Sequence, residues 1–91
     1  MISNRTIEKV FEAARVEEVI GDFVQLKKSG SNYKGLSPFT EERTPSFMVS
    51  PAKQIWKDFS SGKGGNVVAF LMEHDQLSYP EAIKYLAKKY N

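Results

Sequence analysis

Few side chains in this sequence are of the types that do chemistry, and their numbers exclude several kinds of site. The sequence holds no cysteine, which excludes disulfides, cysteine nucleophiles and thiolate zinc sites. Its one histidine, His74, excludes a site built from several histidines and falls on the apolar side of a helical pattern, where we expect it to pack. Glu41 and Glu42 have no partner carboxylate placed for acid–base work, and we expect both in a solvated loop. We predict no catalytic residue in these 91 residues.

A glycine-rich run, Gly62-Lys63-Gly64-Gly65-Asn66, precedes a helical pattern. Such a run can present backbone N–H groups and a lysine to a phosphate. It lacks the four-residue spacer and the Lys-Ser/Thr pair of a nucleotide-binding P-loop. We therefore favour a turn between a strand and a helix over a phosphate site.

Lysines alternate with aromatic residues in the middle of the chain, a composition typical of surfaces that bind single-stranded nucleic acid. Residues 23–65 hold seven basic and three acidic side chains, whereas residues 1–22 hold three basic and five acidic ones. Alternate residues of a strand share a face, so cations and rings can line one surface. The alternative is equally physical, because lysine is common on exposed edge strands, and Trp56 and Phe59 can be core residues. Composition alone leaves the two interpretations even.

The elements that must position these side chains follow from the apolar spacing. Helical spacing predicts helices over about residues 4–15 and 16–23, the first capped by Ser3 or Asn4. Two hairpins follow, with strands over residues 24–27, 33–36, 46–49 and 54–59. Helical spacing resumes after Asn66, and a capping box from Ser78 to Glu81 begins a last helix. The predicted fold class is α+β: a small antiparallel sheet with two helices before it and two after it, in one domain over residues 1–91.

No stretch of the sequence has the ~18–20 consecutive apolar residues that a membrane-spanning helix needs. The first residues also lack the apolar segment of a signal peptide. We therefore expect a cytoplasmic protein without a membrane partner.

Two runs of this sequence are long and specific. The first extends from Val24 to Gln54 and includes Lys34-Gly35-Leu36-Ser37-Pro38-Phe39 and Thr44-Pro45-Ser46-Phe47, and the second extends from Gly64 to Glu73. Both runs resemble the amino-terminal zinc-binding domain of bacterial DNA primase. The resemblance covers nearly the whole chain, and it implies a zinc-ribbon-like sheet.

The resemblance also implies four zinc ligands, Cys-x-x-His on one hairpin and Cys-x-x-Cys on the other. These positions align with Ser37, Thr40, Asp58 and Ser61, so all four ligands are replaced. We expect no metal and no other cofactor, because hydroxyls and one carboxylate are poor substitutes for thiolates and imidazole at a tetrahedral zinc site. Hydrogen bonds among these four side chains and a set of apolar residues would hold the ribbon instead. The apolar set is Leu36, Phe39, Phe47, Ile55, Trp56 and Phe59.

For function, the resemblance implies a module that recognises the single-stranded DNA template for RNA primer synthesis in DNA replication. Catalysis, as a DNA-dependent RNA polymerase (a nucleotidyltransferase), would belong to a polymerase domain beyond Asn91, and a helicase-binding domain would also lie there. The expected partners are the template, the polymerase domain and, through the parent protein, the replicative helicase. The alternative is a protein-interaction module that docks on the polymerase domain or helicase without touching DNA. The expected DNA-binding residues are Lys27, Lys28, Tyr33, Lys34, Arg43, Phe47, Lys53, Trp56 and Lys57.

Overall fold

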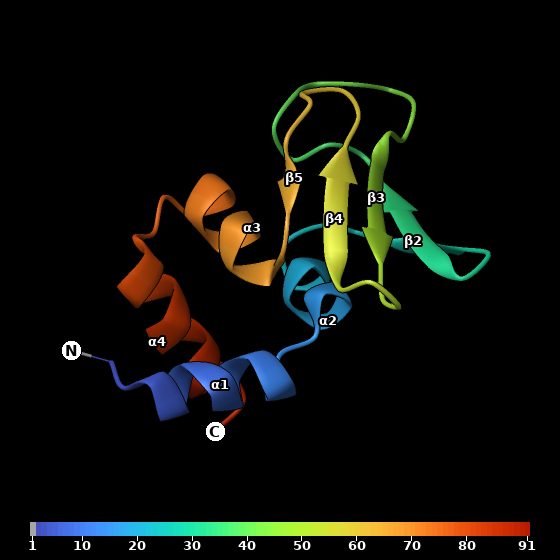
Figure 1. Cartoon of the computed structure of the whole chain (residues 1–91). Coiled ribbons are helices and arrows are strands. Elements are labelled where there is room, and N and C mark those ends of the chain that lie inside the picture. Colours follow the sequence, from blue (N-terminus) through green and yellow to red (C-terminus); the bar gives the residue numbers. More distant parts are fainter. Residues whose placement is uncertain (1) are drawn as a thin grey trace.

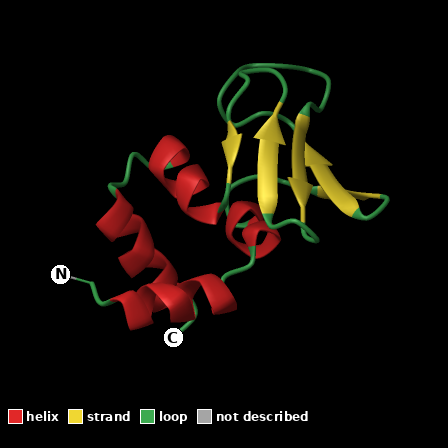
Figure 2. Cartoon of the chain, in the orientation of Figure 1, coloured by secondary structure: helices red, strands yellow, loops and turns green. Residues whose placement is uncertain are grey.

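Two helices, five short strands and two further helices follow one another along residues 2–91, the part that the computed structural model describes (Figures 1 and 2). The α+β class and the helix–sheet–helix order predicted from the sequence are confirmed. The elements are α1 (Asn4–Ala13), α2 (Val16–Gly21), β1 (Lys27–Ser29), β2 (Asn32–Gly35), β3 (Phe47–Ser50), β4 (Ile55–Asp58), β5 (Gly64–Gly65), α3 (Val67–His74) and α4 (Tyr79–Lys89).

The five strands form one antiparallel sheet in the order β1-β2-β3-β4-β5. Successive residues of a strand face opposite sides, so the strand register determines which side chains share a face. One row of partners crosses the sheet on the face that turns away from the helices, and the next row lies on the face that packs against α2 and α3. The outer row is Lys27, Lys34, Met48, Lys57 and Gly64. The inner row is Lys28, Tyr33, Val49, Trp56 and Gly65.

The core lies between the inner sheet face and the helices, and aromatic rings fill its centre. Trp56 and Phe47 are stacked at 5.7 Å between ring centroids, and Phe70 of α3 meets the Trp56 ring edge-on at 5.6 Å. The Trp56 indole N–H donates to the Asn66 carbonyl at 2.8 Å, which satisfies its polar atom inside the core. Beyond the sheet, α4 packs on α1 and α3 (Figure 1).

Helices α1, α3 and α4 begin where the sequence places capping residues, whereas α2 begins after Arg15 without a side-chain cap. Ser3 caps α1 by accepting from the Thr6 backbone N–H, and the capping box of Ser78 and Glu81 at α4 is confirmed. Asn66 caps α3 in the same way. Each cap satisfies a backbone donor that the first helical turn leaves without a partner.

Two predicted boundaries are wrong. The first helix ends at Ala13 rather than near residue 15. The first strand begins at Lys27 rather than Val24, because Val24 is buried in the core and the chain over residues 24–26 runs beside Gly35 outside the ladder. Gly35 permits this approach, since a Cβ there would lie 2.8 Å from the Gln25 carbonyl oxygen.

The glycine run is partly a strand rather than only a turn, because Gly64–Gly65 pairs with β4. A Cβ on Gly65 would lie 2.6 Å from the Ala69 Cβ of α3, so close packing of strand and helix requires glycine there.

No helix within residues 2–91 is long and apolar enough to cross a membrane.

Candidate functional site: a hydrogen-bonded turn cluster and a basic sheet face

The loop after β2 and the turn after β4 meet at a buried carboxylate. Asp58 ends β4 and its side chain is fully buried. Its Oδ2 accepts hydrogen bonds from Ser37 Oγ at 2.7 Å and from Ser61 Oγ at 2.6 Å. Ser37 is therefore joined to Asp58, 21 positions later in the chain, through the same oxygen atom that binds Ser61.

The hydroxyl groups around Asp58 extend this network to the backbone. Ser37 Oγ accepts from the Phe39 N–H at 3.1 Å and from the Thr40 N–H at 3.2 Å. The Thr40 hydroxyl is hydrogen-bonded to the Ser60 hydroxyl across the two turns. We call the five residues Ser37, Thr40, Asp58, Ser60 and Ser61 the Asp58 clasp. The prediction that hydroxyls and a carboxylate close the two turns is confirmed, with Ser60 as an additional member.

Glu42 is a second carboxylate that organises the loop between β2 and β3. Its Oε2 accepts from the Ser37 N–H at 2.8 Å, and its Oε1 accepts from Ser46 Oγ at 2.6 Å. These hydrogen bonds hold the pKa of Glu42 below its ordinary value, and the one from the Ser46 hydroxyl has the largest effect. Glu42 lies in a loop, as expected, and it also bridges the two ends of that loop, which the sequence did not predict.

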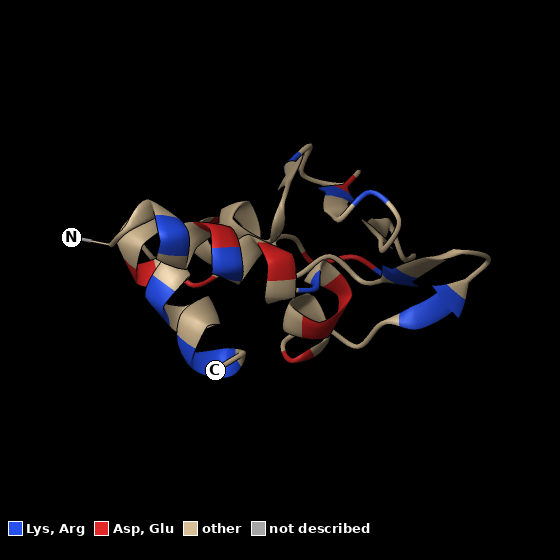
Figure 3. Cartoon of the chain, turned by 60° about the horizontal axis from the view of Figure 1, so that its bottom comes forward, with Lys and Arg blue, Asp and Glu red and all other residues tan. Residues whose placement is uncertain are grey.

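The outer face of the sheet is basic. Lys27, Lys34 and Lys57 are exposed and lie in one row across β1, β2 and β4, and that row contains no acidic residue. In Figure 3, Lys and Arg (blue) colour the β1–β2 hairpin, whereas Asp and Glu (red) gather on α2 and the turn after it. The charge separation seen along the sequence is therefore also a separation in space.

Apolar side chains accompany the lysines on this outer face. Phe59 follows Lys57 by two residues and is 67% exposed, and Ile55 is 43% exposed. Both line a shallow groove with Met48, Lys53 and Lys57. We call this surface the basic face. It is formed by Lys27, Lys34, Met48, Ile55, Lys57 and Phe59.

Two of the rings predicted to stack on DNA bases are not accessible. Phe47 is 0% and Trp56 1% exposed, because the register turns both toward the helices. This part of the prediction is wrong. Conversely, Phe59, Ile55 and Leu36 were expected in the core and are exposed. The exposure of Phe59 could have been inferred from its spacing, since it lies two residues after the exposed Lys57 and residues two apart on a strand share a face.

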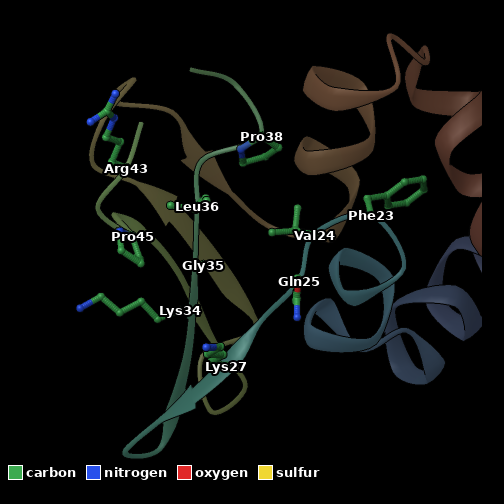
Figure 4. Close-up of a pocket in the computed structure, with 10 residues that line it drawn as sticks. All are labelled: Phe23, Val24, Gln25, Lys27, Lys34, Gly35, Leu36, Pro38, Arg43 and Pro45. Carbon is green, nitrogen blue, oxygen red and sulfur yellow. The ribbon is translucent and has the colours of Figure 1, made fainter. Parts of the chain in front are cut away.

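The remaining predicted contacts lie around the edge of the sheet. Lys28 and Tyr33 are partners on the inner face, with Lys28 Nζ 5.1 Å from the centre of the Tyr33 ring. A second groove, between the chain after α2 and the loop after β2, has three cations at its rim, and none of its described lining residues from Phe23 to Pro45 is acidic (Figure 4). Those cations are Lys27, Lys34 and Arg43.

The geometry defines an α+β ribbon domain with a closed polar tip and one basic face. The family model described as the CHC2 zinc finger matches residues 2–91. The chain therefore belongs to this family, the zinc-binding domain of bacterial DNA primase.

Similarities to individual proteins agree with this family. The chain is 54% identical over 86 residues to a DNA primase of Listeria monocytogenes, a match covering 94% of the chain and 14% of that primase. It is 44% identical over 89 residues to a DNA primase of Pseudomonas aeruginosa, covering 98% of the chain and 13% of that protein. The chain thus spans about a seventh of the length of these relatives.

A solved structure of the Aquifex aeolicus primase, containing its zinc binding and RNA polymerase domains, has the same fold. The TM-score is 0.88 at 41% sequence identity, and the match covers 99% of this chain and 22% of the other. At this identity the likeness extends to the sequence as well as to the fold.

The family description implies a zinc ion, and the side chains at the corresponding tip do not fit one. The clasp offers four hydroxyls and one carboxylate, whereas zinc in structural sites takes cysteine sulfur and histidine nitrogen. Within residues 2–91, no group of three or more His, Cys, Asp or Glu residues is placed to hold a metal ion. Oδ2 of the one carboxylate, Asp58, already accepts from two hydroxyls, and its Oδ1 accepts from the Ser60 N–H at 3.4 Å.

Proposed function

We propose that this chain is the template-recognition module of a DNA primase and that its basic face binds single-stranded DNA. The observation that carries the proposal is the row of Lys27, Lys34 and Lys57 beside the exposed ring of Phe59. Primer synthesis by nucleotidyl transfer would belong to the polymerase domain of the parent protein. The Aquifex aeolicus relative, which has both kinds of domain, supports this division.

The spacing of the lysine row suits a strand of nucleic acid. Neighbouring strands are about 4.8 Å apart, so Lys27 and Lys57, three strands apart in the sheet, span about 14 Å. Ammonium groups over that span can follow several phosphates, while a base stacks on Phe59 for ~1–3 kcal/mol. Lys53, in the turn between β3 and β4, would extend the basic track along the same groove.

The other partners belong to the same proposal. A module that selects the template acts beside the polymerase domain, and the replicative helicase would supply the single strand through the parent protein. The proposed location is the cytoplasm.

Salt-dependent DNA binding tests the proposal. Fluorescently labelled single-stranded DNA is titrated with the chain at low and moderate salt, and affinity must fall as salt rises because phosphate contacts release counterions. The variant Lys27→Glu, Lys34→Glu, Lys57→Glu is expected to bind at least ten times more weakly. The control reverses three exposed lysines of α1 and α4, Lys9→Glu, Lys84→Glu, Lys88→Glu, and keeps its affinity. Equal binding by both variants, or no binding at low salt, refutes the proposal.

One observation favours a second function, docking on a protein. The residues that line the groove of Figure 4 include Leu36, 48% exposed, Phe23, 40% exposed, and the cation Arg43. The test measures the affinity of Leu36→Asp for the polymerase domain and for DNA separately. Loss of the first with retention of the second assigns the groove to a protein partner. Loss of the second alone assigns it to DNA.

A further inference from the structure

The Asp58 clasp occupies the end of the ribbon at which the family description implies a metal. It draws on two segments, Ser37 to Thr40 and Asp58 to Ser61, and each places its two end residues three positions apart. The structure brings these segments together through direct hydrogen bonds between their side chains. The two segments are therefore already joined without an ion between them.

We propose that the Asp58 clasp does the structural work of the zinc ion, so that this chain folds and keeps its basic face without any metal. This inference rests on the fold and on the clasp, and it holds whether or not the basic face binds DNA. It makes this chain a metal-independent member of a zinc-finger family.

The donors and acceptors of the clasp balance without a cation. Asp58 Oδ2 accepts the O–H protons of Ser37 and Ser61, and each hydroxyl oxygen in turn accepts from the backbone. Ser37 takes the N–H groups of Phe39 and Thr40, and Ser61 takes that of Lys63 at 3.3 Å. A carboxylate is an acceptor only, and a hydroxyl gives one proton while accepting others, so this pattern uses each group in its ordinary role. Among residues 2–91, no buried side-chain nitrogen or oxygen is left without a partner.

The replacement also conserves formal charge at the tip. A zinc ion held by three thiolates and a neutral histidine carries a net charge of about −1, the same as one carboxylate among hydroxyls. Loss of the metal and its ligands together therefore leaves the electrostatics beside the lysine row nearly unchanged. An aspartate at the centre of the clasp supplies this negative charge, which a further hydroxyl would not.

Apolar contacts anchor the clasp to the domain. Phe39, between Ser37 and Thr40, lies 5.6 Å from the Trp56 ring and 6.1 Å from the Phe70 ring, centroid to centroid. On its other side, Lys63 Nζ lies 5.7 Å from the Phe39 ring and pairs with Glu73 of α3 at 2.8 Å. The segment that would carry two metal ligands is thus attached to the core by a ring.

Metal content and melting of the unaltered chain give the first test. The chain is purified with zinc in every buffer, and its metal content and Tm are measured before and after dialysis against EDTA. The proposal expects no stoichiometric zinc and the same Tm in both states. One zinc per chain, or a Tm lowered by EDTA, overturns it.

Substitution of the clasp gives the second test. Asp58→Asn keeps the size of the side chain but removes the carboxylate, and it is expected to lower the Tm by about 5–15 °C because buried hydroxyls lose a charged acceptor. The matched control is Asp22→Asn, which removes an exposed partner of Lys89 and is expected to leave the Tm nearly unchanged. Equal Tm values for Asp58→Asn and the unaltered chain overturn the proposal.

Restoration of the metal ligands gives the third test. The variant Ser37→Cys, Thr40→His, Asp58→Cys, Ser61→Cys is expected to bind one zinc, and its cobalt form to show the absorption of a tetrahedral thiolate site. Its fold should now depend on metal, so EDTA lowers its Tm while leaving that of the unaltered chain in place. If the variant binds no metal, folded or unfolded, the clasp does not occupy the metal position and the proposal fails.

Discussion

The two ends of this domain are held together by different forces. At the helix end, Val16, Val19 and Leu86 are fully buried, and close packing of apolar side chains stabilises the fold. At the ribbon tip, the buried centre is the carboxylate of Asp58, and side-chain hydrogen bonds join the segments. The difference teaches that a polar network whose donors and acceptors are all paired can stabilise the end of a small sheet where few apolar side chains are buried. Variants at the two ends should therefore fail in different ways.

The largest effect is expected from the ring that the two ends share. Phe70 is fully buried and contacts Phe47, Trp56 and Phe39. Phe70→Ala should lower the free energy of unfolding by ~3–5 kcal/mol because it leaves a large cavity. Urea unfolding followed by tryptophan fluorescence measures this loss. A cost below ~1 kcal/mol would mean that the rings are not the common support of both ends.

A smaller and more local effect is expected within the clasp. Ser37 is 8% exposed, and its side chain and backbone take part in four of the hydrogen bonds at this tip. Ser37→Ala should cost ~1–3 kcal/mol because the buried Asp58 loses a donor, whereas Ser61→Ala, at an exposed position, should cost ~0.5–1.5 kcal/mol. Urea melts of the two variants side by side make the comparison. A cost from Ser61→Ala above that from Ser37→Ala contradicts the assigned hierarchy.

Acid should weaken the ribbon tip through the protonation of Glu42. Hydrogen bonds from Ser46 and Ser37 lower the pKa of Glu42 in the folded chain below its ordinary value of 4.5. The stability that they contribute is therefore present above that pH and is lost as the pH falls below it. Glu42→Gln should flatten the pH dependence of the Tm in this acidic range. An unchanged slope would show that these hydrogen bonds do not favour the ionised group.

The smallest effect on stability is expected on the basic face. Phe59 is 67% exposed, so Phe59→Ala should change the free energy of unfolding by less than about 0.5 kcal/mol. If the basic face binds DNA as proposed, the same variant should weaken binding by ~1–3 kcal/mol through the loss of a stacked base. Melting and DNA titration on one protein sample separate the two effects. A large drop in Tm would place Phe59 in the core, as sequence reasoning first suggested.

Element type and order could be predicted from the sequence because apolar spacing reports them directly. The capping residues Ser78 and Glu81 and the turn chemistry between the strands marked several boundaries correctly. It was harder to predict on which face of the sheet each aromatic residue lies. Trp56 and Phe59 belong to one run of the sequence, and only the strand register shows that the first is buried and the second exposed. The strand Gly64–Gly65, which pairs with β4, could not be predicted because glycines have no side chains to form an apolar pattern.

The clasp was predictable in part. Family spacing pointed to Ser37, Thr40, Asp58 and Ser61, and the structure brings them together. The roles of Ser60 and Glu42 were not predicted, because hydrogen bonds from a side chain to a distant backbone group depend on how the loop folds. Such contacts leave no periodic signal in the sequence.

Amide hydrogen exchange at the tip tests the central claim most directly. The backbone N–H groups of Phe39 and Thr40 donate to Ser37 Oγ inside the clasp. If the tip is held without a metal ion, these two amides exchange slowly and at the same rate in excess EDTA and in excess zinc. Exchange in EDTA at the rate of an unfolded peptide, with protection restored by zinc, would contradict the account.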